Sequence, residues 1–389
     1  MPLVYAGERL ETIASFPTLY RYLPVTTTTR HDEKPLVIFI PGMALLGRVA
    51  YGGHSGYDAR DFLAYWLNEM GYNVLAISYP LELERDDDDD SDDHLQEKLA
   101  QCPHFTPRDW GEQAVQTARR VTEENGLARD IVVAAWSMAG KILKPLVFSA
   151  RQHGLNLRLF VSLAATPAGV KWLNFTPPRV RETEAGFAAG SQAGIQHFMQ
   201  QFQAQNIRQE GEGVIDDKKL RCEYIGNTPV GLTNAGLVYD GESPHGERFK
   251  AATSVDLGTI EPNGYDDMVH FPYIAAIRPT SPSDLRHALT DGAAWGLLLT
   301  TKMAIDVTRV VGGTRKWQGD EDEVWHEIQR LVSSAPGRLT SDIIRGNHMF
   351  FIGQTGARAT AEAMDRLIRE ADTIGLEMEA ALGRLQSAV

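Results

Sequence analysis

The sequence has few cysteines and no long hydrophobic run. Its 389 residues include only two cysteines, Cys102 and Cys222, too few for a disulfide framework and too far apart for a CxxC metal site. No stretch approaches the ~20 consecutive apolar residues of a membrane helix, and the first residues lack the basic and apolar regions of a signal peptide. These absences predict a soluble, cytoplasmic protein that does not engage membranes.

Positive charge is also scarce. The 38 lysines and arginines are outnumbered by 51 acidic residues, and the net charge is −13. Such a chain repels a phosphate backbone and has no compensating basic stripe, so nucleic acid is not an expected partner. Many acids lie in residues 86–93, where alternate aspartates have calcium-loop spacing but Ser91 replaces the required glycine. We interpret this run as an exposed loop and expect no metal or organic cofactor.

The order of the predicted elements in the first half of the chain is typical of an α/β protein. Nearly continuous apolar runs indicate strands that are covered on both faces. These strands are expected at residues 18–22, 35–40, 72–80, 130–135 and 157–164. Helices are expected at residues 61–70, 106–124 and 139–153. Strands and helices that alternate with short connections form a mostly parallel sheet with helices on both faces.

This alternation is lost at about residue 167 and returns at about residue 304. The segment between is rich in glycine, glutamine and scattered aromatic residues. We therefore predict a core domain in two parts, 1–166 and 304–389, with an insertion at 167–303. The second part is expected to contain strands at 305–311 and 339–344 and helices at 321–332 and 357–385.

A serine at the end of one predicted strand is flanked by small residues. The segment reads Ala135-Trp136-Ser137-Met138-Ala139. A sharp turn from strand to helix strains the backbone at the serine, and bulky residues two positions away would clash. Such a turn would present the hydroxyl above the sheet and direct the backbone N–H of Met138 at an oxyanion on the substrate. The alternative is a buried serine at an ordinary strand end.

The serine motif resembles the nucleophile elbow of the α/β-hydrolase family, which is usually Gly-x-Ser-x-Gly and here is Ala-x-Ser-x-Ala. The resemblance implies that Ser137 is the nucleophile and that the N–H of Met138 belongs to the oxyanion hole. Pro41-Gly42-Met43 stands where the family carries His-Gly-x. The N–H of Met43 would then be the second donor, and Gly42 would let the backbone approach the substrate. A plain loop glycine is the alternative for Gly42.

The family order of serine, acid and histidine along the chain requires a late histidine as the general base. His348 lies in Gly-Asn-His-Met-Phe at residues 346–350, between the last predicted strand and the last predicted helix. This segment resembles the Gly-x-His-x-Phe of the family, which implies that His348 is the base. The alternative is a surface histidine.

The third member of the triad is marked less clearly. The family places the acid after the strand that we expect to end near Val311, yet no acid follows it directly. Asp320 is the nearest aspartate, and we predict that it is the acid. Glu321, Asp322 and Asp291 remain alternatives, because acids at the start of a helix are also stabilised by the helix dipole.

The insertion occupies the place where family members carry a lid over the active site. The resemblance implies that Trp172 in this lid, together with Gly42 and Trp136, contacts a hydrophobic small-molecule substrate. The aromatic residues could equally form a core of the lid itself. The oligomeric state is left open, a homodimer included.

We predict a serine hydrolase that cleaves an ester, thioester or lactone through an acyl-enzyme. One alternative is a C–C bond hydrolase or an acyltransferase or cyclase acting on a polyketide-like or aromatic intermediate. A second alternative is a non-catalytic ligand-binding protein on the same fold.

Overall fold

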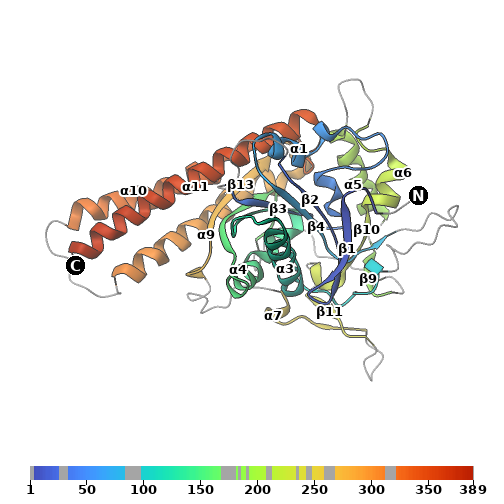
Figure 1. Ribbon diagram of the computed structural model, residues 1–389, viewed down its shortest axis with the longest axis horizontal. Coiled ribbons are helices and arrows are strands. Elements are labelled where there is room, and N and C mark those ends of the chain that lie inside the picture. The colour runs from blue at the N-terminus through green and yellow to red at the C-terminus, as the bar shows by residue number, and fades with distance from the viewer. Residues whose placement is uncertain are drawn as a thin grey trace.

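A computed structural model describes residues 4–25, 34–83, 98–167, 181–182, 185–189, 192–206, 213–233, 236–241, 248–257, 268–311 and 321–388. An eight-stranded sheet lies at its centre, with the strand order β1-β2-β4-β3-β6-β7-β13-β14 (Figure 1). The strands are β1 (Glu8–Ile13), β2 (Phe16–Leu23), β3 (Leu36–Ile40), β4 (Val74–Ser78), β6 (Asp130–Trp136), β7 (Asn156–Leu163), β13 (Tyr273–Pro279) and β14 (Asp342–Ile344). The β1–β2 and β2–β4 pairs are antiparallel, and all pairs from β4 to β14 are parallel.

The apolar runs predicted as strands form the middle of this sheet. Every residue of β3 and of β4 is buried, as is every residue of β6 after the first. A strand with helices on both faces has no solvent-facing side, which explains why these sequences do not alternate between apolar and polar residues. The predictions of strands at 18–22, 35–40, 72–80, 130–135 and 157–164 are confirmed.

Helices cover both faces of the sheet (Figure 1). Helix α3 (Pro107–Asn125) packs against α4 (Leu143–Gln152), and α1 (Leu63–Glu69) packs against the C-terminal helix α11 (Gln354–Ala388). Helix α3 begins as its sequence predicts, because Thr106 and Asp109 form a reciprocal capping box before and within the first turn. Gly126 ends it in the left-handed conformation, with φ 61°. No helix of the described ranges combines the length and apolar character needed to cross a membrane.

The predicted strand at 305–311 is wrong, because these residues end the long helix α9 (Leu285–Val311). The buried residues Trp295, Leu299 and Met303 are spaced by four, which is helical spacing. The β-branched residues that follow continue the same helix. The strand at this position in the sheet is instead β13, which lies inside the segment predicted as an insertion and pairs with β7 and β14.

Three long helices extend together beyond one edge of the sheet (Figure 1). They are α9, α10 (Glu321–Leu339) and α11, and each packs against the other two. The helices predicted at 321–332 and 357–385 are confirmed and are longer than expected. The strand predicted at 339–344 is present as the three residues of β14.

The segment between β7 and β13 forms small elements beside the main sheet. They are β8 (Arg181–Glu182), β9 (Phe187–Ala189), α5 (Gln192–Gln205), α6 (Asp217–Lys219), a π-helical turn (Leu220–Tyr224), β10 (Gly226–Pro229), a 3-10 turn (Val230–Leu232), β11 (Leu237–Tyr239), β12 (Phe249–Ala251) and α7 (Ser254–Leu257). Strand β5 (Glu82–Leu83) joins β10, β9 and β8 in a four-stranded sheet. Trp172, Asp320 and the acidic run 86–93 lie outside the described residues. A lid function for this segment stays a prediction.

A buried ion pair ties the N-terminal hairpin to the 3-10 turn at Gly47–Ala50, shortly after β3. Arg48 Nε donates to Glu8 Oε1 at 2.8 Å, and neither side chain is exposed to solvent. Arg48 Nη1 also donates to the backbone oxygen of Glu223 at 2.7 Å. Since an unpaired charge would be costly at this depth, the pair fixes the chain that continues from the loop at residues 41–46.

Candidate active site

Ser137 sits at a strained turn between β6 and a 3-10 turn (Ser137–Ile142) that leads into α4. Its φ is 54°, a left-handed conformation that a residue with a side chain rarely adopts. Ala135 and Ala139 on either side are fully buried. At Gly140, an added Cβ would lie 2.4 Å from the backbone oxygen of Thr166, so only glycine fits. The small residues around the serine thus permit a tight turn, as the sequence indicates.

The structure brings Ser137 and His348 together, 211 positions apart in the chain. Ser137 Oγ lies 2.8 Å from His348 Nε2, and His348 Nδ1 lies 2.7 Å from Asp284 Oδ2. A carboxylate can only accept, so Nδ1 carries the proton and Nε2 accepts from the serine hydroxyl. The three side chains form a continuous chain of hydrogen bonds that ends at the serine oxygen.

The acid beside His348 is therefore Asp284, and the prediction of Asp320 is corrected on this point. Asp284 ends a 3-10 turn (Pro282–Asp284) that directly follows β13. Asp320 lies outside the described residues, and both ring nitrogens of His348 already have partners. Of the alternatives, Asp291 contacts His287 instead of His348, and Glu321 and Asp322 begin helix α10. The error followed from the missed strand β13, since the acid comes after that strand.

Asp284 is held in its ionised form. Burial alone would raise the pKa of this carboxyl group, but the hydrogen bond from His348 and the charges of His348, His287 and Arg286 outweigh it, and the pKa of Asp284 is lowered. A carboxylate in this state can stabilise an imidazolium on His348.

Trp136, predicted as a substrate contact, packs against His348 and has no exposed surface. Its Nε1 donates to the backbone oxygen of His348 at 3.0 Å, and the two rings pack with centroids 5.1 Å apart. The residue before Ser137 therefore supports the loop that carries His348. Trp172, the other predicted aromatic contact, is outside the described residues.

Gly42 lies directly against Ser137. A Cβ added to Gly42 would be 2.6 Å from Cβ of Ser137 and 2.9 Å from the ring of Trp136. The loop is fixed on its other side, where Tyr79 Oη donates to the backbone oxygen of Gly42 at 2.9 Å. Met43 follows and is 51% exposed, whereas Met138 is buried. The two backbone segments predicted to supply the oxyanion hole thus adjoin Ser137.

The segment between β7 and β13 also supports the loop that carries His348. Asn347 N donates to Gln205 Oε1 on helix α5 at 3.1 Å, and Asn347 Nδ2 donates to the backbone oxygen of Gln201 at 2.5 Å. Gln201 Nε2 donates in turn to the backbone oxygen of Ser283 at 3.0 Å. Helix α5 therefore joins the loops of His348 and Asp284. No local motif marks these glutamines, so their role cannot be predicted from the sequence.

One set of side chains has the composition of a metal site. Single ligand atoms of Asp284, His287 and His348 lie within 4.8 Å of one another. However, Arg286 Nη2 lies 2.5 Å from His287 Nε2, and Nε2 of His348 is hydrogen-bonded to Ser137 Oγ. A permanently charged guanidinium at a ligand nitrogen opposes a cation, so these residues fit a hydrogen-bonded network better than a metal centre.

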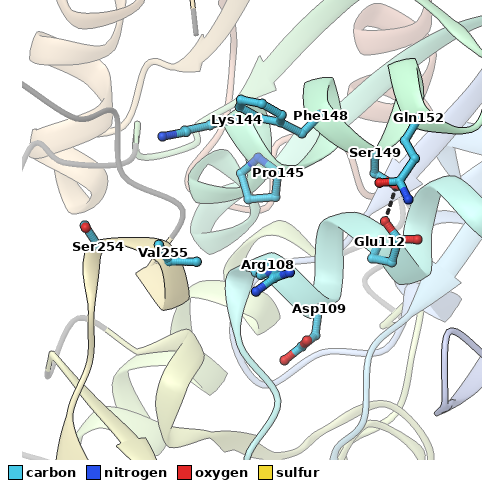
Figure 2. Close-up of a pocket in the computed structure, with 10 residues that line it drawn as sticks. All are labelled: Arg108, Asp109, Glu112, Lys144, Pro145, Phe148, Ser149, Gln152, Ser254 and Val255. Carbon is cyan, nitrogen blue, oxygen red and sulfur yellow. Dashed lines mark hydrogen bonds between the residues drawn. The ribbon is translucent and has the colours of Figure 1, made fainter. Parts of the chain in front are cut away.

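A cavity of about 590 Å³ lies apart from this cluster, between α3, α4 and α7 (Figure 2). Its wall includes Phe148 and Val255, which are two of the exposed large apolar residues, and the hydrogen-bonded pair of Ser149 and Glu112 (Figure 2). The remaining lining residues are Arg108, Asp109, Lys144, Pro145, Gln152 and Ser254. It contains none of the three side chains joined at Ser137.

The order of the site residues along the sheet decides the family of folds. The serine follows β6 at a strained turn into a helix, the acid follows β13, and the histidine follows the last strand, β14. This is the elbow and the serine, acid, histidine order of one family. The chain has the α/β-hydrolase fold.

No family model matches the sequence, and no curated protein matches it. Among solved structures, this chain is similar to MenH from S. aureus, at 10% identity over 91% of this chain and 98% of that chain, with a TM-score of 0.41. It is also similar to a carboxylesterase from Nitrososphaera gargenis, at 13% identity over 95% of this chain and 98% of that chain, with a TM-score of 0.41. For carboxyl esterase 2 from Tuber melanosporum the identity is 13% over 94% of this chain and 87% of that chain, with a TM-score of 0.40. The fold assignment rests on the strand order and site of the chain itself.

Proposed function

We propose that this α/β-hydrolase is a serine hydrolase that cleaves an ester, thioester or lactone of a hydrophobic small molecule through an acyl-enzyme. Ser137 is the nucleophile, His348 the general base and Asp284 the acid that orients the base. The hydrogen-bonded chain from Ser137 Oγ through His348 to Asp284 carries this proposal, because it prepares the hydroxyl to lose a proton as it attacks.

The proposed reaction has two halves. Ser137 Oγ bonds to the substrate carbonyl carbon while its proton passes to His348 Nε2, and Asp284 stabilises the imidazolium. The tetrahedral intermediate then breaks its bond to the leaving group, which takes the proton from His348. Water attacks the acyl-enzyme with His348 again as the base, so that the acid is released and Ser137 regains its proton.

The proposed oxyanion hole consists of the backbone N–H groups of Met43 and Met138. The close contact of Gly42 with Ser137 supports this assignment, since a donor must lie beside the carbon that the serine attacks. The exposed side chain of Met43 next to the nucleophile supports an apolar substrate group. A cytoplasmic location remains a prediction from the sequence.

A fluorophosphonate probe tests the nucleophile. We expect stoichiometric labelling of the wild-type protein at the peptide that contains Ser137, and hydrolysis of p-nitrophenyl esters that is lost in Ser137→Ala. Ser149, a buried serine whose hydroxyl is bonded to Glu112, offers the matched control Ser149→Ala, which should retain labelling. An unlabelled wild type, or equal ester turnover in wild type and Ser137→Ala, would contradict the proposal. Weak ester turnover with clean cleavage of a 1,3-diketone would indicate the C–C hydrolase alternative.

A further inference from the structure

A second histidine packs against the base. His287 on helix α9 is 4% exposed, and its ring stacks on that of His348 with centroids 5.0 Å apart and an angle of 29° between the planes. The ring of Trp136 also contacts His348. The imidazole that must transfer a proton therefore has two aromatic neighbours, and one of them is itself an imidazole.

Hydrogen bonds determine the tautomer of His287. Arg286 Nη2 lies 2.5 Å from His287 Nε2, and a guanidinium can only donate, so Nε2 must accept. Nδ1 then carries the proton and donates to Asp291, whose carboxyl oxygens lie 2.9 and 3.0 Å away. A protonated His287 would leave two donors facing each other at Nε2. This arrangement keeps His287 neutral with its ring plane fixed.

The surrounding charges agree with a neutral ring. Burial lowers the pKa of His287 well below its ordinary value, and the positive charges of His348 and Arg286 act in the same direction while Asp284 opposes them. Burial raises the pKa of Asp291 well above its ordinary value, and Arg286 opposes this. Arg278 on β13 also acts to lower the pKa of Asp291, as does His348, whereas Asp284 acts to raise it. Asp291 and Asp284 act to raise the pKa of Arg286, which in turn acts to lower that of Lys141, four residues after Ser137.

The neutrality of His287 matters for the proposed reaction. His348 becomes an imidazolium each time it takes the serine proton, and a second imidazolium stacked at 5.0 Å would repel it. A neutral imidazole carries no charge that would repel this cation. Arg286 is itself anchored, because it donates to the hydroxyl of Thr166, the residue whose backbone N–H bonds to the backbone oxygen of Ser137 at 3.0 Å.

We propose that His287, locked in one tautomer between Arg286 and Asp291, is a positioning residue that fixes the ring plane of His348. The role rests on the proposed function, in which His348 moves a proton between Ser137 and the leaving group. His287 touches neither the substrate nor the serine in this scheme and acts only through the base.

Nuclear magnetic resonance of ¹⁵N-labelled histidine side chains tests the tautomer without any reference to activity. The His287 signals are those that disappear in His287→Gln. We expect them to show a neutral ring with the proton on Nδ1 and no titration from about pH 5 to pH 8. In the same variant, the Nδ1–H signal of His348 should broaden as the ring loses its support. A proton on Nε2 of His287, titration within this range, or an unchanged His348 signal would overturn the proposal.

Two substitutions separate the ring from its hydrogen bonds. Glutamine at 287 can still accept from Arg286 and donate to Asp291 but has no ring, whereas His287→Phe keeps the ring alone. We expect His287→Gln to lower kcat about tenfold with KM within about twofold, because a misplaced base slows proton transfer without weakening binding. His287→Phe should recover part of this loss. The exposed His326 on α10 supplies the matched control, His326→Gln, with wild-type kcat.

The kinetic result can also overturn the proposal. Wild-type kcat in His287→Gln would exclude a positioning role. A merely structural role would be shown if His287→Gln and His287→Phe lost kcat to the same extent and were both less thermally stable than the wild type. If the wild type neither hydrolyses esters nor reacts with the fluorophosphonate, the proposed function fails, and the histidine spectra still decide whether His287 holds His348.

Discussion

Asp284 accepts the hydrogen bond from Nδ1 of His348 and so decides which ring nitrogen faces the serine. In Asp284→Asn, the amide can present its NH₂ group to Nδ1 and force the ring proton onto Nε2. Nε2 can then no longer accept the proton of Ser137. We expect kcat for p-nitrophenyl ester hydrolysis to fall by about 10³–10⁴-fold with little change in thermal stability.

Asp320→Asn is the natural control for this experiment, since Asp320 was the acid expected from the sequence. It should hydrolyse the same ester at the wild-type rate. Full activity in Asp284→Asn together with inactivity in Asp320→Asn would reverse the assignment of the acid.

Gly42 allows the loop that carries Met43, a proposed oxyanion donor, to approach Ser137. The Cβ of Gly42→Ala would lie 2.6 Å from Cβ of Ser137, so the loop or the serine must move. Displacing one oxyanion donor costs about 10²–10³-fold in kcat, and we expect a loss of this order for the variant. Steady-state kinetics and the rate of fluorophosphonate labelling provide the measurement.

A glycine with free space serves as the control for Gly42. Gly383 on α11 has nothing within 4 Å of an added Cβ, and Gly383→Ala should keep wild-type kinetics. Wild-type kcat in Gly42→Ala would place the oxyanion hole elsewhere.

The residues that the sequence identifies at the site are those with a local motif. Ser137 is marked by the small residues around it, and His348 by its position between the last strand and the last helix. No local motif surrounds Asp284. The triad acid can be predicted from sequence only once the strand that precedes it has been identified. The apolar run Tyr-Ile-Ala-Ala-Ile of β13 could have predicted this strand. Prolines and serines then separate the strand from Asp284. The stacking of His287 on His348 depends on tertiary packing and leaves no trace in local sequence.

At the scale of elements, capping residues are a reliable sequence signal because they act within one turn. The Thr106 hydroxyl accepts from Asp109 N at 3.3 Å, and Asp109 Oδ2 accepts from Thr106 N at 3.0 Å. Thr106→Ala removes half of this box and should lower the free energy of unfolding by about 1 kcal/mol. Urea denaturation measures the change, and ester hydrolysis should be unaffected since α3 does not carry the site.

Thr308 on α9 is a matched control for the capping threonine. It is exposed, and its hydroxyl donates to the backbone oxygen of Ala304 within the same helix. Thr308→Ala should change the free energy of unfolding by no more than about 0.5 kcal/mol. If Thr106→Ala lowered the free energy of unfolding by no more than Thr308→Ala does, the capping box would contribute little to stability.

One element was predicted wrongly, the strand at residues 305–311, and its cause is local propensity. Residues 305–311 are rich in β-branched side chains, and local propensity alone favours a strand there. The residues before them already follow helical spacing, so the helix extends through the run, and the Lys302–Asp306 ion pair at i,i+4 supports it. Whether a short apolar run is a strand or part of a helix is decided by what it packs against.

At the scale of the whole molecule, a buried lysine couples the 3-10 turn that begins at Ser137 to the segment between β7 and β13. Lys141 lies four residues after Ser137, and its Nζ donates to the backbone oxygen of Leu232 at 2.7 Å. Burial, with a smaller contribution from the charge of Arg286, lowers the pKa of Lys141 to about 7. In the unfolded chain the same amine has its ordinary pKa of 10.5.

This difference makes stability depend on pH in a predictable direction. Between the two pKa values, from about pH 7 to 10.5, the unfolded chain binds more protons than the folded one, so the free energy of unfolding rises with pH. A single group contributes at most about 1.4 kcal/mol per pH unit to this slope. Lys141→Met removes the contribution, and urea denaturation at intervals from pH 7 to 10 should show a flatter dependence of the free energy of unfolding on pH.

Lys144→Met, the same change at a half-buried lysine one turn later, is the control and should keep the wild-type slope. Equal slopes in the wild type and in Lys141→Met would mean that the amine is charged in the folded protein throughout this range, and that the contact with Leu232 involves an ammonium group.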